Sequence, residues 1–316
     1  MTTLKKIGKY YYKINRNKKR TRISERKYFK INRKVSVKQR KSKRKKHMKG
    51  GNIGDFFEKY KKFKEGEEDT GITEIGRGGF GTVYVDSAQQ ESVFKIPTVT
   101  CNREKEIEIY NDIKQQEEEK GGSIDTDRCK LIRLIKSETI DSKCIMEITK
   151  AHNPDGGQIT IQPLFGKKEQ NKTFDGRGEF LGVDQLITKG FFTKDNIKEY
   201  ITELAIVMAR FHFKLGFDGT DIELFLSKKS NEEKDSTIIY IGDFDQVKSC
   251  AKLPEDEKIN ALEWCLMAVD YFPLFTEERD SDYNELVTTF KDEYIKEAEI
   301  HGKQLTADAV LKRFKS

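Results

Sequence analysis

Residues 71–84 read Gly-Ile-Thr-Glu-Ile-Gly-Arg-Gly-Gly-Phe-Gly-Thr-Val-Tyr. Three of the glycines, Gly76, Gly78 and Gly81, have the spacing GxGxxG, and Val83 follows the last of them by two residues. Glycine is required where the backbone approaches a phosphate closely or takes a positive φ. The same letters also occur in dinucleotide-binding folds, where the third glycine opens a helix. The residues after Gly81 distinguish these possibilities, because they predict either a helix or a strand.

The residues after the glycines predict strands and not a helix. Residues 82–85 continue as a strand, a polar turn covers 86–91, and residues 92–97 form a second strand with one charged side chain, Lys95. A lysine inside a buried strand needs an anionic partner, because an unpaired charge is costly to remove from water. This order resembles the Gly-rich loop and the third-strand lysine of protein kinases. From the residues alone, a surface hairpin with an exposed Lys95 is the alternative.

The kinase resemblance implies a site for ATP. In that family the backbone of the loop covers the triphosphate, and the strand lysine, here Lys95, pairs with the α- and β-phosphate oxygens. The partner of this lysine is a glutamate on the next helix, which the sequence predicts over 103–113. Glu106 has the matching context, and Glu104 and Glu108 remain alternatives.

Residues 144–149 resemble the fifth kinase strand where it runs into the hinge between the lobes. On this resemblance Met146 lies at the back of the adenine pocket, and the backbone from Glu147 onward contacts adenine. Core packing alone also explains an apolar residue at position 146. The residues implied to bind ATP are Gly76, Arg77, Gly78, Gly79, Phe80, Gly81, Val83, Lys95, Met146, Glu147 and Ile148.

A second group of matches lies in the C-terminal half. Apolar residues at three- and four-residue spacing predict a helix from 193 to 211, as in the helix before the kinase catalytic loop. The resemblance then places Asp218 on the catalytic aspartate and Glu223, five residues on, on the metal-binding asparagine. A predicted strand over 237–242 leads into Asp-Phe, which resembles the Asp-Phe-Gly motif with Asp243 as the Mg²⁺ ligand.

Several positions depart from the kinase pattern. Gly216 and Phe217 stand where kinases have His and Arg, Thr220 replaces the lysine near the γ-phosphate, Glu223 replaces asparagine, and Asp245 replaces the last glycine. No Ala-Pro-Glu follows, so a reduced C-lobe is expected. Loss of one preorganised charge costs about 10²–10³ in rate. Three functions therefore stay open: an active protein kinase, a nucleotide-binding pseudokinase scaffold, and a small-molecule phosphotransferase.

The predicted fold class is α+β: a two-lobed protein-kinase-like fold with a reduced helical C-lobe, preceded by a disordered basic tail. The predicted domains are a tail and Gly linker over 1–54, an N-lobe over 55–150 and a C-lobe over 151–316. The kinase resemblance covers residues 70–250. Residues 200–300 are similar to divergent fungal and large-DNA-virus kinase-like proteins. ATP, Mg²⁺ and a protein substrate are the implied cofactors and partners.

Residues 1–50 differ from the rest of the chain in charge. They carry 22 Lys and Arg and one acid, Glu25, whereas the remainder carries 38 basic and 52 acidic side chains. So charged a segment cannot bury a core, and we expect it to be largely disordered. The run Tyr-Tyr-Lys-Ile-Asn-Arg at 11–16 returns as Tyr-Phe-Lys-Ile-Asn-Arg at 28–33. Aromatic rings interleaved with cations predict binding to nucleic acid or another polyanion, with a targeting or inert tail as the alternative.

The remaining sequence features concern the compartment. No run of eighteen apolar residues is present, so we expect no membrane span, and no apolar stretch follows the basic N-terminus as in a secretory signal. Five cysteines without CxxC or His-paired spacing predict free thiols in a reducing compartment. The expected location is intracellular: the cytoplasm or nucleus, or a virion or host cell if the chain is viral.

Overall fold

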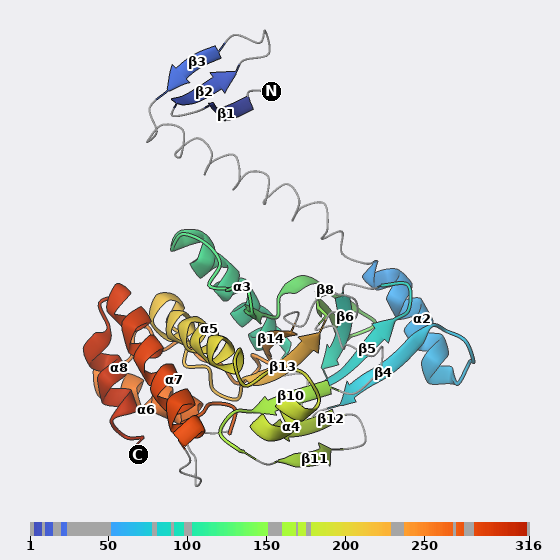
Figure 1. Cartoon of the computed structure of the whole chain (residues 1–316). Helices are drawn as coiled ribbons and strands as arrows, with labels where there is room; N and C mark the ends of the chain where they lie inside the picture. Colours follow the sequence, from blue (N-terminus) through green and yellow to red (C-terminus); the bar gives the residue numbers. More distant parts are fainter. Residues whose placement is uncertain are drawn as a thin grey trace. The chain divides into compact units, whose positions relative to one another are not determined.

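The computed structural model of the chain describes residues 3–7, 10–14, 20–23, 52–77, 81–89, 92–97, 103–150, 160–168, 170–174, 178–228, 237–267, 270–274 and 281–314. The chain separates into two compact units, Met1–Gly50 and Gly51–Ser316. Both are drawn in Figure 1. The first boundary lies close to the predicted end of the tail at residue 54. The predicted division at residue 150 stays a prediction.

The first unit contains a small antiparallel sheet. Strand β1 (Thr3–Ile7) pairs with β2 (Tyr10–Ile14), which pairs with β3 (Arg20–Ile23). The sequence predicted a largely disordered tail, and these strands differ from that expectation. Tyrosine and isoleucine favour strands, and they make up four of the five residues of β2.

The larger unit has a mixed α+β fold. Its largest sheet is antiparallel, with the strand order β4-β5-β6-β9-β8. The bounds of its strands are β4 Ile72–Arg77, β5 Gly81–Asp86, β6 Ser92–Pro97, β8 Leu134–Ile140 and β9 Lys143–Thr149. Helix α3 (Arg103–Glu119) connects β6 to the segment before β8. The two strands of the predicted hairpin are β5 and β6, and the predicted hinge strand is β9, which pairs with β6.

Helix α2 (Ile53–Glu65) packs on one face of this sheet. Asn52 caps its N-terminus by accepting a hydrogen bond from the Gly54 amide, and Gly66 ends it at a φ of 83°. The apolar stripe of the helix forms a separate cluster with one face of the sheet, and its buried members are Ile53, Phe56, Phe57, Tyr60, Ile72, Tyr84, Phe94, Ile96 and Ile145. The opposite face of the sheet faces the larger core.

Two further sheets complete the unit. β13 (Glu223–Lys228) pairs antiparallel with β14 (Thr237–Gly242), and β14 pairs in parallel with β7 (Cys129–Leu131). The third sheet has the order β10-β12-β11, with bounds Thr160–Leu164, Gly178–Gly182 and Asn171–Phe174. Helix α4 (Val183–Thr188) follows β12.

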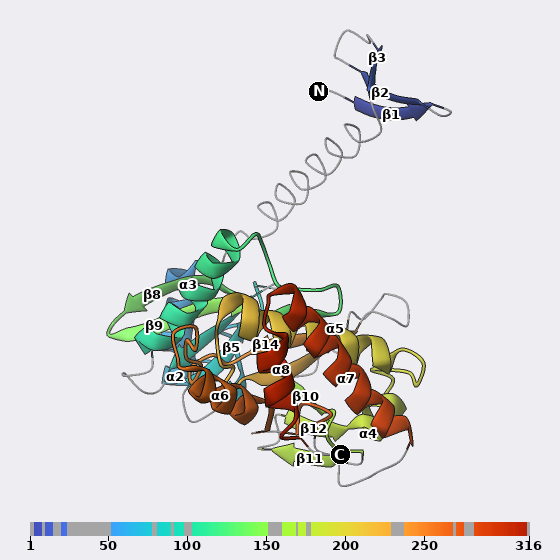
Figure 2. The same cartoon turned by 90° about the vertical axis from the view of Figure 1, so that its left-hand side faces the viewer.

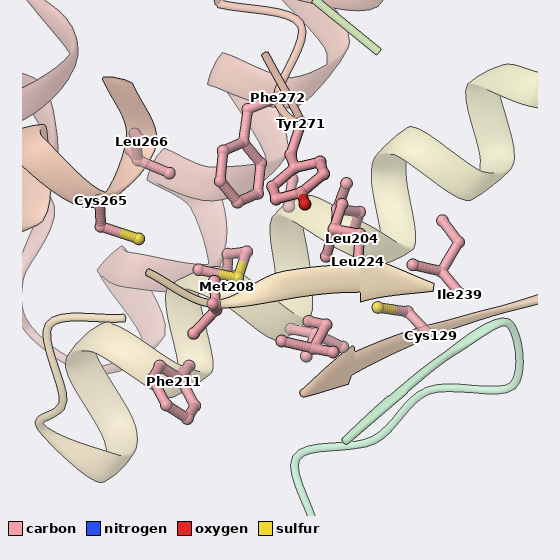
Figure 3. Packing of buried hydrophobic residues seen from close by; sticks show 14 of the residues in the cluster. Cys129, Leu204, Met208, Phe211, Leu224, Ile239, Cys265, Leu266, Tyr271 and Phe272 are labelled. Atoms are coloured by element: carbon pink, nitrogen blue, oxygen red, sulfur yellow. The ribbon is translucent and has the colours of Figure 1, made fainter. Parts of the chain in front are cut away.

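Helices make up most of the C-terminal part. α5 (Ile197–Ala209) continues as a π-helical segment, η2 (Arg210–Leu215), and Gly216 ends it at a φ of 84°. α7 (Ser281–Ile300) packs against α5 and η2, and α8 (Gln304–Leu311) packs against both α7 and α6 (Glu255–Met267) (Figures 1 and 2). Figure 3 shows how side chains of α5, β13, β14 and the 271–272 turn meet in one core. No described helix is long and apolar enough to cross a membrane.

Candidate functional site

Lys95 is at the centre of the candidate site. Its Nζ donates to Oε1 of Glu106 at 2.9 Å and to Oδ1 of Asp243 at 2.6 Å. The lysine is only 7% exposed and Glu106 only 2%, so both charges are removed from water. A buried charge is tolerated when it is paired and hydrogen-bonded, and Lys95 has two such partners. The contact joins β6, α3 and the turn after β14.

Strand register places Lys95 on the inner face of the sheet. Val83 of β5 lies opposite Lys95 on one side, and Met146 of β9 lies opposite it on the other. Directly opposed residues share a face of the sheet, so these three residues and Val93, two positions before the lysine, lie on one face. Among the three acids that the sequence offered as partners, Glu106 is the one in contact, while Glu104 and Glu108 are on the outer side of α3.

The electrostatics keep Lys95 charged. Burial lowers the pKa of Lys95, but the carboxylates of Asp243 and Glu106 outweigh it and raise this pKa above its usual value. Burial raises the pKa of Glu106 to about 7, against the opposing effect of Lys95. An ammonium beside two carboxylates leaves the group one negative charge in excess when all three are ionised.

The glycine-rich turn is described at its two ends. Gly76 and Arg77 close β4, Gly81 opens β5, and Gly78, Gly79 and Phe80 lie outside the described residues. A Cβ on Gly81 would come within 3.3 Å of the Ile96 carbonyl oxygen and of Cε of Lys95, so a glycine is needed for β5 to pass this close. The guanidinium of Arg77 is exposed and held by Glu74 through two hydrogen bonds of 2.8 and 3.0 Å.

The three predicted hinge residues differ in the face on which they lie. Met146 and Ile148 are buried on the face of Lys95 and belong to the main core. Glu147 lies opposite Phe94 on the other face, where its Oε1 accepts a hydrogen bond from Ser92 Oγ at 2.7 Å. Its carboxylate therefore serves the sheet, and its backbone lies in a strand that is paired on both sides, with β6 and with β8.

Asp243 begins the turn after β14 in a left-handed conformation, with a φ of 60°. Aspartate tolerates this region better than most residues, and such conformations concentrate at functional sites. The next residue, Phe244, is fully buried between two aromatic rings. Its centroid lies 5.2 Å from that of Tyr110 on α3 and 5.8 Å from that of Phe211 on η2. These ring contacts fix the position of Asp243, the residue before Phe244, relative to α3, the helix that carries Glu106.

Glu223 enters the site from the first position of β13, opposite Gly242. Its Oε2 accepts a hydrogen bond from Gln162 Nε2 at 3.0 Å, and Gln162 Oε1 accepts one from the Tyr271 hydroxyl at 2.8 Å. Burial, followed by the charge of Asp243, raises the pKa of Glu223 to about 8. The sequence assigned neither Gln162 nor Tyr271 to the site, because they come from β10 and from the turn after α6, far from Glu223 in the chain.

Two further carboxylates lie near Asp243. Asp245 is buried, and within the described residues neither of its carboxylate oxygens has a hydrogen-bond partner. Burial and then the charge of Asp243 raise the pKa of Asp245 to about 6. Asp221 is exposed, has a φ of 61°, and has a pKa raised by partial burial and then by Asp243. Across the described ranges, no three His, Cys, Asp or Glu side chains are close enough to form a ready-made metal site.

Asp218 is placed differently from these acids. It is 4% exposed, and its Oδ1 accepts hydrogen bonds from the amides of Thr220 at 3.1 Å and Lys248 at 2.9 Å. Burial, followed by the charge of Asp218, raises the pKa of the Cys250 and Cys265 thiols. The structure therefore brings together Lys95, Glu106, Asp243 and Glu223, whereas Asp218 is held by two backbone amides.

The cysteines are consistent with a structural role. Cys129, Cys144, Cys250 and Cys265 are free and buried, and Cys101 lies outside the described residues. The chain matches no protein-family model and no curated protein.

Proposed function

We propose that residues 51–316 form a divergent protein-kinase-like domain that binds ATP and transfers its γ-phosphate, with Mg²⁺, to a hydroxyl of a protein. The observation that carries the proposal is the contact of one buried lysine with two acids, Glu106 and Asp243. Phosphoryl transfer needs little covalent chemistry from the protein, and depends on placing positive charge and oxygen ligands around the phosphates.

The arrangement of the elements supports a kinase-like fold. Five antiparallel strands have the order β4-β5-β6-β9-β8, the glycine-rich turn joins the first two, and helix α3 follows the third. The β13–β14 hairpin presents Glu223 at its start and Asp243 just after its end, so that one short element carries both proposed metal ligands. In this proposal β4, β5, β6, β8, β9 and α3 are the N-lobe, and α5 to α8 with the β13–β14 hairpin are the reduced C-lobe.

The surface for ATP follows from the shared face of the sheet. Val83 is only partly buried and offers an apolar surface for adenine beside Lys95, whose ammonium would then lie at the phosphates. Val93 and Met146 are buried in the core on the same face. Glu147 and Ile148 are paired with β6 and with β8, so we assign their backbone groups no contact with adenine. Arg77 is held by Glu74 outside this face, so we assign it no contact with ATP.

The acids around Asp243 fit a divalent cation. Carboxylate oxygens are the ligands that Mg²⁺ prefers, and one or two of them suffice when phosphate oxygens supply the rest. Asp245 has two buried oxygens without a hydrogen-bond partner among the described residues, and the charge of Asp243 raises the pKa of its neighbours. Bound Mg²⁺ would neutralise phosphate charge. Asp243 and Glu223 would hold it, and the Gln162–Tyr271 chain would orient Glu223.

We assign the residue that orients the acceptor hydroxyl by comparing the solvent exposure of two candidates, Asp218 and Asp221. Asp218 has the expected sequence position, but its carboxyl group is buried, and one of its two oxygens, Oδ1, accepts hydrogen bonds from two backbone amides. Asp221 is exposed and interacts electrostatically with Asp243. We therefore assign the acid–base role to Asp221 and a structural role to Asp218.

The experiment compares transfer of labelled γ-phosphate to basic protein by wild type, Lys95→Met and Asp243→Asn, with Mg²⁺ or Mn²⁺. Both variants should lower the rate by about 100-fold or more, since each removes a charge at the phosphates. Lys59→Met is the matched control, because Lys59 also pairs with a buried acid, Asp86, but on the outer face of the sheet. It should retain transfer.

Two further readouts separate the alternatives. A melting temperature raised by ATP in wild type but not in Lys95→Met, without any transfer, would replace the enzyme by a nucleotide-binding scaffold. That second candidate is favoured by Thr220, which brings no charge to the γ-phosphate. If the protein shows no phosphate transfer and ATP does not raise its melting temperature, the proposal is contradicted.

The roles of the two aspartates are tested in the same assay. Asp221→Asn should reduce transfer by about 10²–10⁴ with little change in melting temperature, as for loss of a positioned acid–base group. Asp218→Ala should lower stability by about 1–3 kcal/mol, because two amides lose their acceptor. Full transfer by Asp221→Asn, together with loss in a folded Asp218→Asn, would return the role to Asp218.

A further inference from the structure

The N-terminal unit combines an extreme charge with a defined sheet. Residues 3–23 contain nine Lys and Arg and no acid, and they include three consecutive tyrosines, 10–12. β1, β2 and β3, which include the three tyrosines, form one antiparallel sheet. We propose that one face of this sheet, the Tyr12 face, binds single-stranded nucleic acid. The inference does not depend on the proposed kinase function of residues 51–316.

The register defines the two faces. Residues directly opposite in neighbouring strands share a face, and alternate residues along a strand also share it. Tyr12 of the central strand lies opposite Lys5 on one side and Arg22 on the other. The whole Tyr12 face consists of Thr3, Lys5, Ile7, Tyr10, Tyr12, Ile14, Arg20 and Arg22.

The opposite face has a different composition. Tyr11 is its single aromatic residue, and its partners are Lys6 and Ile23. The remaining members of that face are Leu4, Lys13 and Thr21. Tyr10 and Tyr12 therefore share a face that Tyr11 does not, although all three are consecutive in the sequence.

This placement fits unpaired bases. Tyr10 and Tyr12 are two residues apart on one strand, about 7 Å along its direction. Aromatic residues on a sheet are platforms on which successive bases stack, and cations beside them neutralise the phosphates. In the Tyr12 row each neighbouring strand supplies a cation, Lys5 or Arg22. Bases of a duplex already stack on one another, so stacking on tyrosine rings favours the binding of single strands over duplexes.

The probe is a fluorescein-labelled oligo(dT) of twelve nucleotides, titrated with the full chain at physiological ionic strength. The key comparison is Tyr12→Val with Tyr11→Val: both remove one ring from the same strand and keep a strand-favouring residue. Tyr12→Val and Tyr10→Val should each weaken binding roughly 5- to 100-fold, the range for loss of one stacking platform. Tyr11→Val should weaken it less than twofold, and Tyr12→Phe should bind like wild type.

Other outcomes overturn the proposal. Equal effects of the three tyrosine variants, or no effect of any, would mean that the charge of the tail binds the oligonucleotide without a specific face. Duplex DNA of equal length that binds as tightly and loses affinity in the same variants would exclude base stacking. Loss of binding to phosphatidylserine vesicles in Tyr12→Val, with unchanged oligo(dT) binding, would assign the face to a lipid surface.

Discussion

At the scale of single residues, the buried charge of Lys95 and the charges of its two acidic partners depend on one another. Replacing this lysine leaves Glu106 and Asp243 without the ammonium between them. Breaking a buried ion pair costs about 3–5 kcal/mol, because the remaining charge is uncompensated. The Lys95→Met variant therefore has to be compared at a temperature at which it is folded, so that lost transfer reflects the missing charge at the phosphates.

His212 is a residue of another kind, because its environment keeps it neutral. It is buried at the end of α5 and η2, and its Nδ1 lies 2.6 Å from the Tyr294 hydroxyl. Burial lowers the pKa of His212 to about 3, from an ordinary value of 6.5. It lies against Tyr294 of α7 and against the backbone of Asp218, so it belongs to the packing of the core.

The first residue-scale prediction is an acid dependence of stability. Between pH 6.5 and 3 the unfolded chain binds a proton at His212 that the folded chain does not, so the free energy of unfolding falls as the pH is lowered through this window. At pH 4.5 this amounts to about 2–3 kcal/mol. His212→Asn should remove that part of the acid dependence in urea unfolding at pH 7 and pH 4.5.

Tyr294→Phe is the control for this effect. It removes the hydroxyl that faces His212 and keeps the imidazole, so its loss of stability in acid should follow that of wild type. Identical pH profiles for wild type and His212→Asn would show that His212 is not the titrating group.

At the scale of elements, α2 protects one face of the main sheet. Phe56 stacks on Phe94 of β6, with ring centroids 3.9 Å apart and planes inclined by 12°. The ion pair of Lys59 with Asp86 ties the same helix to the end of β5. The helix therefore packs against β6, the strand that carries Lys95, on the face of the sheet opposite to that lysine.

Phe56→Ala is the test at this scale. Loss of a fully buried phenylalanine costs about 3–5 kcal/mol, because the site collapses only in part. Phe63→Ala on the same helix, where the ring is only partly buried, should cost clearly less. Midpoints of urea unfolding measure both. Equal small losses would mean that α2 contributes little to the fold.

Local pattern predicted many elements but not their assembly. The β5–β6 hairpin with Lys95, β9, α3 and α5 were all predicted from periodicity and turn residues. The pairing of β7 with β14 was not, because it joins segments about a hundred residues apart and no local signal sets that register. For the same reason the Gln162–Tyr271 chain to Glu223 was missed. Local sequence also does not reveal the burial of Asp218, which led us to propose Asp221 for the role expected of Asp218.

At the scale of the whole molecule, the two units carry opposite charge. Residues 1–50 hold 22 basic side chains and one acid, and the remainder has a net negative charge. The main core and the α2 cluster lie entirely within Gly51–Ser316. Among the described residues, the larger unit therefore supplies every member of the main core and of the α2 cluster.

Truncation tests this division. Removing residues 1–50 should leave the melting temperature and ATP response within experimental error of the full chain, and should abolish binding to oligo(dT). Removing residues 1–65 also deletes α2 and exposes Tyr84, Phe94 and Ile145, so this variant should be unfolded or aggregated. If both truncations melt like the full chain, α2 is dispensable. If both unfold, the first unit is needed for the fold.

The contact between Lys95 and Asp243 also has a consequence for synthesis. The two residues are 148 positions apart, and β7 lies beside a strand that is made more than a hundred residues later. A growing chain folds its N-terminal parts first, and contacts of long sequence separation form late. The glycine-rich hairpin and α3 can be complete while Lys95 has only Glu106 beside it. The full charge arrangement exists only once the last strand of the β13–β14 hairpin has been translated, so a prematurely terminated chain cannot present it.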